Sequence, residues 1–332
     1  MAVLVFGSRG RIGLCAVDAL QRLGHEVIES DPSLREIRYD DLDWHKVKLV
    51  FSCAPFYANY GHAKEARLRG LPYIDLGGDT FTSQQIQELF VGANQGCFTD
   101  WGLAPGFVNI WAEHELDKLN YTPNTIKLMC GGLSQNRPNN RLAYERTWST
   151  SGLWNEYSGD CEILSNGKLT TIPALTRDLN VVWKDPKCPW LTKILERFHT
   201  KGGIGSSLES FKTRGIKNAS YQTLRYMGHI DYISFLLDDC KLSREEFIKA
   251  IDNVCPVTLE DAVVTMLEID GKLIQKTYFS DEKWTAMQKM TAWPTVAVCQ
   301  LLLEGKLPKK PVLSYEDVPE EEFNQILNKL SI

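Results

Sequence analysis

The chain has 332 residues, 43% of them hydrophobic, and a formal net charge of -5. A chain of this length usually forms two domains, each with its own core. The charges are spread along the sequence without a cluster of Lys and Arg, which argues against a nucleic-acid partner.

The sequence also argues against a membrane or secreted protein. Residues 2–6 are apolar, but Arg9 and Arg11 follow at once, so neither a long apolar span nor a cleavable leader is expected. Nine cysteines lie at irregular spacings, with no CxxC pair and no histidine placed to complete a metal site. We therefore predict a cytoplasmic protein with reduced thiols, no structural disulfide and no bound metal.

The first predicted element is a β-strand at residues 3–6, followed by a glycine-rich turn and a helix running toward Leu23. A dinucleotide-binding turn needs glycine where the chain bends, where backbone approaches a pyrophosphate and where helix packs on strand. The helix N-terminus then offers N–H groups and a positive dipole end to the phosphates. The spacing is GxxGxxG rather than GxGxxG, because Arg9 stands where a second glycine is usual. The predicted pyrophosphate-binding residues are Gly7, Ser8, Arg9, Gly10, Arg11, Ile12 and Gly13.

A second predicted strand, residues 26–30, ends at Asp31, about 20 residues after the turn. An acid there accepts hydrogen bonds from both ribose hydroxyls and repels a 2′-phosphate, and no Arg follows it immediately. We therefore predict NAD as the cofactor in preference to NADP. The alternative is a glycine loop of another α/β protein, in which Asp31 caps a turn.

The pattern repeats with a strand at residues 48–53, a helix at 60–68 and a strand at 73–76, as βαβ units require. The strand ends meet at one edge of a parallel sheet, where open α/β folds bind ligands. After residue 98 a last strand leads into a rigid turn and a helix ending at Leu119. These ends supply the remaining predicted cofactor contacts: Cys53, Ala54, Pro55, Gly77, Ala104, Pro105 and Gly106.

Several segments carry a family resemblance. They read GLAPGFVN at 102–109, GGLSQN at 131–136, TWSTSGLWNEY at 147–157, FHTKGG at 198–203 and TLRYMGH at 223–229. Together they resemble the saccharopine dehydrogenase-like reductases, and within that family they are most similar to lysine 6-dehydrogenase. The resemblance covers nearly the whole chain.

The resemblance implies an NAD(P)-dependent amino-acid or amine dehydrogenase of the α/β class. Residues 1–106 plus 285–332 would form a Rossmann domain with a doubly wound parallel sheet. Residues 107–284 would form an α+β, mixed-sheet domain for substrate binding and dimerisation, and a homodimer is expected. Alternating runs at 126–130 and 263–269 independently predict strands in this second domain.

Three residues are the predicted catalytic group. Arg225 ends an apolar strand, and its planar fork suits a carboxylate, although it could instead pair with an acid of the protein. His229 follows Gly228 where a helix is expected, as a proton carrier or as a capping or packing residue. Asp75 ends a strand and could pair with a substrate ammonium or close a turn.

Five further residues are predicted to bind the substrate. Asp79 follows two glycines and, like Asp75, is either an ammonium partner or a turn former. His199 lies in FHTKGG, where a glycine-rich loop could bring it to a ligand, or it is simply a loop histidine. The polar residues that complete this group are Tyr57, Asn109 and Ser149.

Three functions remain open from the sequence. The first is oxidation of the amine of a small, lysine-like amino acid, with hydride passing to NAD. The second is the reverse chemistry, reduction of an imine formed from an aldehyde and an amino acid, as in saccharopine and carboxynorspermidine dehydrogenases. The third is a dinucleotide-binding sensor without turnover.

Overall fold

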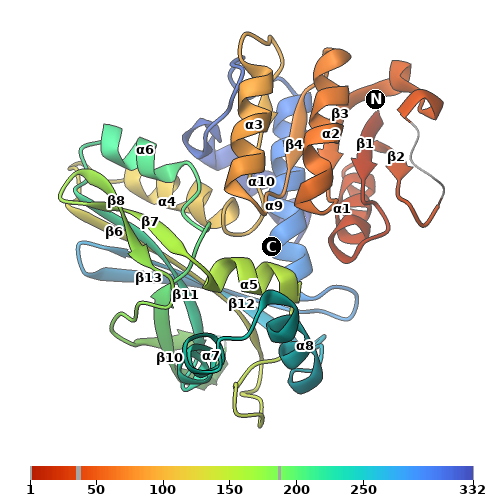
Figure 1. The fold of residues 1–332 in the computed structure, drawn as a ribbon. Coiled ribbons are helices and arrows are strands. Elements are labelled where there is room, and N and C mark those ends of the chain that lie inside the picture. Colours follow the sequence, from red (N-terminus) through yellow and green to blue (C-terminus); the bar gives the residue numbers. More distant parts are fainter. Residues whose placement is uncertain (1, 35–38, 186–187, 332) are drawn as a thin grey trace. The chain divides into compact units, whose positions relative to one another are not determined.

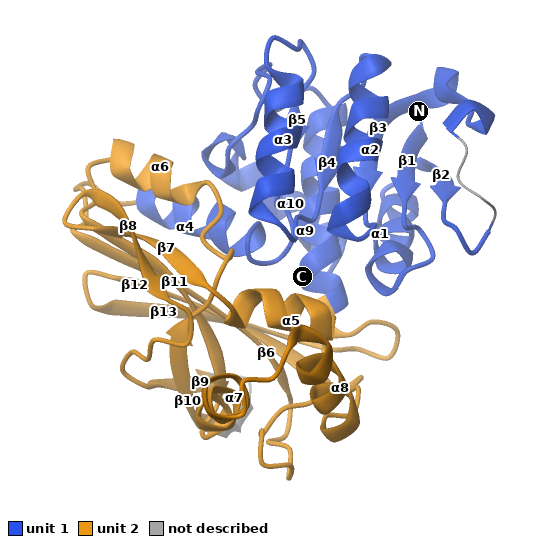
Figure 2. Ribbon diagram, viewed as in Figure 1, with its two compact units in different colours: residues 1–117, 288–332 blue, residues 118–287 orange. Residues whose placement is uncertain are grey.

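The computed structural model describes residues 2–34, 39–185 and 188–331. It divides into two compact units (Figure 2): Met1–Asp117 with Gln288–Ile332, and Lys118–Met287. We call the first the nucleotide unit, after the coenzyme that its sequence predicts, and the second the mixed-sheet unit. In the described part of the chain, no helix has the length and apolar character needed to cross a membrane.

The nucleotide unit contains a five-stranded parallel sheet in the order β2-β1-β3-β4-β5 (Figure 1). All of β1 is buried, as a central parallel strand covered on both faces should be, which explains its continuous apolar sequence. The sequence predicted four of these strands with ends correct to about one residue. The strands are β1 (Ala2–Phe6), β2 (Glu26–Ser30), β3 (Val47–Ser52), β4 (Tyr73–Asp75) and β5 (Cys97–Phe98).

Helices follow the strands of this sheet and complete its core. Ile86 and Phe90 pack with Leu4, Phe6 and Val50 in one buried cluster. The unit's helices are α1 (Arg11–Arg22), α2 (Phe56–Leu68), α3 (Thr80–Phe90), α4 (Phe107–Asp117), α9 (Ala286–Leu303) and α10 (Glu320–Lys329), with 3-10 turns at η1 (Tyr39–Asp41), η2 (Trp44–Lys46) and η4 (Tyr315–Asp317).

Helix α4 belongs to the nucleotide unit, whereas the sequence analysis began the second domain at residue 107. The reason lies in its contacts with the C-terminal segment. His114 Nε2 donates to the carbonyl oxygen of Val318 at 2.8 Å, and its ring packs edge-on against Phe323. Nearly every residue of α4 is buried, so the helix cannot be separated from this unit without exposing apolar surface.

The mixed-sheet unit contains an eight-stranded sheet with the path β13-β12-β6-β11-β10-β9, to which β7 and β8 attach beside β11. The pairing of β11 with β6 is parallel and the others are antiparallel. The two strands predicted here lie within β6 and β12. The strands are β6 (Thr125–Ser134), β7 (Asp160–Ser165), β8 (Lys168–Pro173), β9 (Val181–Asp185), β10 (Cys188–His199), β11 (Asn218–Tyr226), β12 (Asp261–Ile269) and β13 (Lys272–Phe279).

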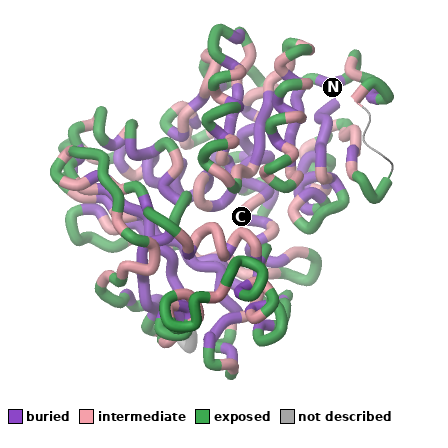
Figure 3. Tube along the Cα trace, in the orientation of Figure 1, coloured by how far each residue is buried: buried purple, intermediate pink, exposed green. Residues whose placement is uncertain are grey.

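This sheet curls on itself. Trp183 of β9 donates its indole N–H to Thr277 Oγ1 of β13 at 3.1 Å, although these strands stand at opposite ends of the path. The inner face encloses a buried cluster that includes Trp183, Leu195, Leu224 and Met266, and Figure 3 shows the buried strands of the unit in purple.

Helices pack on the other face of the same sheet. Phe198 of β10 contacts a cluster containing Leu153, Ile233, Phe247 and Ile251 from three of these helices. The helices of the unit are α5 (Thr150–Tyr157), α6 (Ser207–Thr213), α7 (His229–Ser234), the π-helical η3 (Phe235–Asp239) and α8 (Arg244–Val254).

Candidate coenzyme and substrate sites

Two of the three turn glycines are required by packing. Gly7 has φ +70°, and a Cβ there would lie 2.7 Å from Ala54 N and 2.8 Å from Cys53 C. A Cβ at Gly13 would lie 2.0 Å from Gly7 O. The turn therefore closes tightly on itself and on the end of β3, beside Cys53 and Ala54, whose predicted contact with the cofactor stays a prediction.

The third glycine is under less pressure from the protein. Gly10 is the N-cap of α1, with no side-chain hydrogen bond to the helix end, and a Cβ there would lie 3.3 Å from Gly7 O. The N–H groups of Arg11, Ile12 and Gly13 open the helix, where no intrahelical acceptor exists. Because Gly10 and Gly13 carry no side chain, a pyrophosphate can approach the backbone N–H groups at this helix end closely.

Asp31 lies directly after β2 and takes part in the turn. Its Oδ2 accepts the Arg9 N–H at 3.1 Å, and its Oδ1 accepts the N–H and the hydroxyl of Ser33 at 2.9 and 2.7 Å. Burial raises the pKa of Asp31, but these hydrogen bonds outweigh it and hold the pKa below the usual value. The carboxylate is thus ionised at neutral pH. The Arg9 guanidinium pairs with Glu29, with Nε 2.9 Å from Oε2.

Asp75 is joined to a residue that the sequence analysis did not select. Asp75, 1% exposed at the end of β4, accepts on Oδ1 the N–H groups of Gly77 at 2.8 Å and Asp100 at 3.1 Å. Asp100 has φ +67°, a left-handed backbone uncommon outside glycine. Its Oδ1 accepts the Ser83 hydroxyl at 2.9 Å, and a Cβ at Gly77 would lie 2.3 Å from that same oxygen. Gly77 therefore makes room for the Asp100 carboxyl.

The two carboxyls titrate unlike ordinary aspartates. Burial raises the pKa of Asp75 to about 6. Burial, and then the nearby Asp75 charge, raise the pKa of Asp100 to about 7. Near neutral pH the Asp75–Asp100 pair therefore exchanges a proton readily, which is the property required of a general acid or base.

The other predicted residues of the nucleotide unit have local roles in the fold. Asp79 caps α3, with Oδ2 accepting the N–H and hydroxyl of Thr82 at 2.9 and 2.8 Å. Asn109 is buried, and its Oδ1 accepts the Gly106 N–H at 2.9 Å, which fixes the turn that carries Ala104 and Pro105. Tyr57, near the start of α2, is exposed.

Arg225 is buried on β11 and held at several atoms. Its Nε donates to Tyr157 Oη at 3.1 Å, its Nη1 donates to Leu224 O at 2.9 Å, and its guanidinium carbon lies 5.3 Å from the ring centre of Tyr144. Its Nη2 lies 4.0 Å from Glu156 Oε2. Burial raises the pKa of Glu156 to about 7 despite the Arg225 charge.

His229 is fully buried at the first position of α7, with both ring nitrogens engaged. Nδ1 lies 2.8 Å from Leu142 O, and Nε2 lies 2.9 Å from Tyr157 Oη. Because a carbonyl only accepts, Nδ1 carries the hydrogen and Nε2 accepts from the tyrosine hydroxyl. Burial, and then the Arg225 charge, lower the pKa of His229 to about 3. The imidazole is therefore neutral at physiological pH.

Glu156 and Tyr157 were missed by the sequence analysis. Both end α5 within the family segment TWSTSGLWNEY, which is the signal in the sequence that points to them. Ser149, which was selected, is the N-cap of α5, and its Oγ accepts the Gly152 N–H at 3.4 Å.

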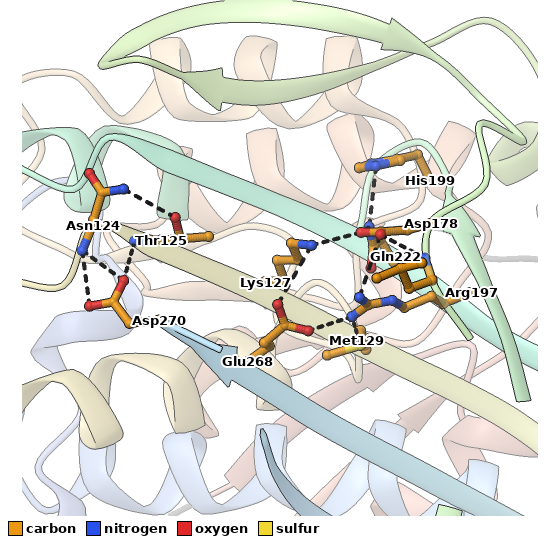
Figure 4. A network of polar contacts seen from close by, with 11 residues as sticks. Asn124, Thr125, Lys127, Met129, Asp178, Arg197, His199, Gln222, Glu268 and Asp270 are labelled. Atoms are coloured by element: carbon orange, nitrogen blue, oxygen red, sulfur yellow. Dashed lines mark hydrogen bonds and ion pairs between the residues drawn. The ribbon is translucent and has the colours of Figure 1, made fainter. Parts of the chain in front are cut away.

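His199 is the last residue of β10, not a loop residue, and it faces the interior of the curled sheet (Figure 4). Its Nε2 lies 3.2 Å from Gln222 Nε2, and Gln222 also donates to Asp178 at 2.8 Å. The network continues from Asp178 to Lys127 at 2.8 Å, and Arg197 donates to Glu268 at 2.7 Å. Burial lowers the pKa of His199.

The parallel sheet, the glycine turn before α1 and the acid after β2 are the features of the Rossmann fold, here followed by a mixed-sheet unit. The chain belongs to the Saccharopine dehydrogenase C-terminal domain family, whose sequence model matches residues 102–332. The family resemblance predicted from the short motifs is thereby confirmed.

Solved structures agree with the fold. Saccharopine dehydrogenase (L-Glu forming) from Saccharomyces cerevisiae matches with a TM-score of 0.68 at 15% identity, over 99% of this chain and 97% of that chain. Amine dehydrogenase from Mycobacterium smegmatis matches at 0.47 and 10% identity, over 96% and 95%. A Thermus thermophilus dehydrogenase in complex with NAD and UDP-GlcNAcA matches at 0.39 and 10%, over 99% and 92%. The first of these confirms the predicted fold class, and the other two are too distant to add to it.

Proposed function

We propose that this protein is an NAD-dependent oxidoreductase that oxidises the amine of a small amino acid, in the manner of lysine 6-dehydrogenase. The observation that carries the proposal is the coenzyme turn. Gly7 and Gly13 admit no side chain, α1 starts immediately after the uncapped Gly10, and an ionised Asp31 stands at the end of β2. Family membership supports the amino-acid substrate.

The charges around Asp31 favour NAD over NADP. Asp31 and Glu29 place two carboxylates beside the expected ribose position, and both would repel a 2′-phosphate. Among the described residues of the turn, Arg9 contacts these acids, and its guanidinium pairs with Glu29.

The chain's own groups match the demands of amine oxidation. Bound NAD supplies a hydride acceptor. The Asp75–Asp100 pair can take the proton of a substrate ammonium, because its pKa values lie near neutrality. Arg225 offers a fixed guanidinium to a carboxylate.

The same pair supports a second candidate, the reductive direction. A carboxyl pair that holds a proton near neutral pH can donate it to an imine as readily as it accepts one from an ammonium. Reduction of an imine formed from an aldehyde and an amino acid, as in the saccharopine and carboxynorspermidine dehydrogenases, therefore uses the same residues.

Coenzyme titration tests the first step. Calorimetry of the purified protein should show that NAD binds more tightly than NADP. Asp31→Asn should weaken the binding of NAD by about tenfold and so reduce the difference in affinity between NAD and NADP. Failure to bind either coenzyme would end the proposal.

Turnover tests the second step. With NAD and a panel of basic amino acids, NADH absorbance should rise with lysine or a close relative, and NADH should be consumed with aldehyde and amino acid if the reductive direction prevails. A protein that binds NAD yet converts no amine in either direction would be a dinucleotide sensor instead.

A further inference from the structure

Arg225 and Glu156 face one another in the mixed-sheet unit without bonding. Their closest atoms, Nη2 and Oε2, are 4.0 Å apart, which is too long for a hydrogen bond. The side chains are 3% and 21% exposed. No hydrogen bond reaches the Glu156 carboxylate from a residue within 2–34, 39–185 or 188–331. No described residue takes up the Arg225 Nη2 donors or the Glu156 carboxylate oxygens by a hydrogen bond, so this arrangement leaves hydrogen-bonding capacity for a ligand.

A chain of hydrogen bonds holds the guanidinium in place. Leu142 O accepts from His229 Nδ1, His229 Nε2 accepts from Tyr157, and Tyr157 accepts from Arg225 Nε. Burial raises the pKa of Tyr157, so its hydroxyl keeps the hydrogen that it donates. With Nε and one Nη1 hydrogen engaged, the Nη2 end of the fork is directed toward Glu156.

We infer that Arg225 and Glu156 together bind the α-amino-acid end of the substrate, with its carboxylate on Arg225 and its α-ammonium on Glu156. Tyr157 and His229 are then positioning residues that orient Arg225. This inference rests on the proposed function. An α-amino acid carries a carboxylate and an ammonium on one carbon, which matches an acid and a base facing each other across a short gap. The amine left for oxidation is the one at the far end of the substrate.

The titration of Glu156 agrees with this geometry. Burial raises the pKa of Glu156 to about 7, so its carboxyl is partly protonated near neutral pH. An ammonium placed against the carboxylate favours its charged form.

Three related ligands separate the two contacts: lysine, 6-aminohexanoate, which lacks the α-ammonium, and 1,5-diaminopentane, which lacks the carboxylate. Glu156→Gln should weaken the binding of lysine by about 10- to 100-fold and leave the affinity for 6-aminohexanoate unchanged. Arg225→Lys should weaken the binding of lysine and of 6-aminohexanoate, which both carry a carboxylate, by a similar factor. The affinity for 1,5-diaminopentane should not change. Each affinity is measured by calorimetry on the enzyme–NADH complex and as KM during turnover.

Tyr157→Phe tests the positioning role. Loss of the hydroxyl frees Arg225 Nε, so KM for lysine should rise about tenfold while kcat changes by less than about twofold. The matched control is Tyr226→Phe, which removes another buried hydroxyl, bonded to Ser134 O at 2.8 Å, from the next position of β11 on its opposite face. The control should leave KM unchanged.

The outcomes distinguish this inference from the proposed function. Equal wild-type affinity for lysine and 1,5-diaminopentane, or equal losses for all three ligands in both variants, would overturn the inference even if amines are oxidised. If NADH never forms, the proposed function fails, but the calorimetric pattern still decides whether Arg225 and Glu156 bind an α-amino acid.

Discussion

The two units each bury a polar cluster, and the clusters differ in charge. The nucleotide unit holds two acids, Asp75 and Asp100, joined through a backbone N–H. The mixed-sheet unit holds an acid and a base, Glu156 and Arg225, that do not touch. Two buried like charges cannot both ionise cheaply, so the first cluster responds to protons. On our inference, the opposite charges of the second cluster respond instead to a ligand that carries both signs.

This difference separates two tasks within one proposed reaction. Handling a proton requires a pKa near the working pH, which burial and a neighbouring carboxylate provide. Holding a substrate requires fixed charges with unused hydrogen-bonding capacity, which the relay through Tyr157 and His229 provides. On our inference His229, which the sequence predicts as either a proton carrier or a capping or packing residue, serves the second task.

The largest expected effect comes from replacing Asp100, which removes the acid pair from the comparison of the two units. Asp100→Asn removes the titrating group, so kcat for amine oxidation should fall by about 100- to 10,000-fold while NAD affinity is unchanged. Steady-state kinetics and coenzyme titration measure both. Asp43→Asn, at an exposed ion pair with Lys46, is the charge-matched control and should keep wild-type kcat. A wild-type kcat in Asp100→Asn would show that the acid pair has no part in the reaction.

Asp75→Asn sharpens the same comparison. The Asp75 charge helps to raise the pKa of Asp100, so its removal should lower that pKa. The acidic limb of the kcat/KM profile should therefore move to lower pH. Asparagine retains an oxygen to accept the Asp100 N–H, so the fold should persist. An unmoved limb in an active variant would mean that Asp75 acts only as a structural residue.

The acid pair should also be visible in stability without coenzyme. Both folded pKa values lie above the unfolded value of about 3.9, so the folded state retains protons that the unfolded state has lost. Stability from this source is complete below about pH 4 and is lost as the pH rises through about 7. Urea unfolding should show the wild type losing on the order of 7 kcal/mol across this window relative to the Asp75→Asn/Asp100→Asn double variant, because each raised pKa contributes about 1.4 kcal/mol per unit. Parallel pH dependences for the two proteins would contradict the raised pKa values.

The smallest effect concerns Asp79, which lies beside the acid pair but caps α3. Asp79→Ala should cost about 1 kcal/mol in unfolding free energy, and Asp79→Ser should recover most of it, because serine also caps helices. Thermal or urea unfolding measures the cost. If Asp79→Ser is as stable as the wild type but has a raised KM, Asp79 binds the substrate ammonium, and the acid cluster extends to a third member.

The sequence by itself determined where the glycine-rich turn of residues 7–13 lies, which strands flank it, and that Asp31 follows the second strand. Most of those features depend on residues close together in the chain: Gly13 is required by its contact with Gly7 in the same turn, whereas Gly7 is required by the end of β3 as well. The short motifs were also enough to predict the family. Only the tertiary structure decided which polar side chains meet. Asp100 reaches Asp75 through a left-handed backbone, and Tyr157 joins His229 across 72 positions of chain. His199 turns inward because strand register, which depends on the partner strand, sets the face on which each side chain lies.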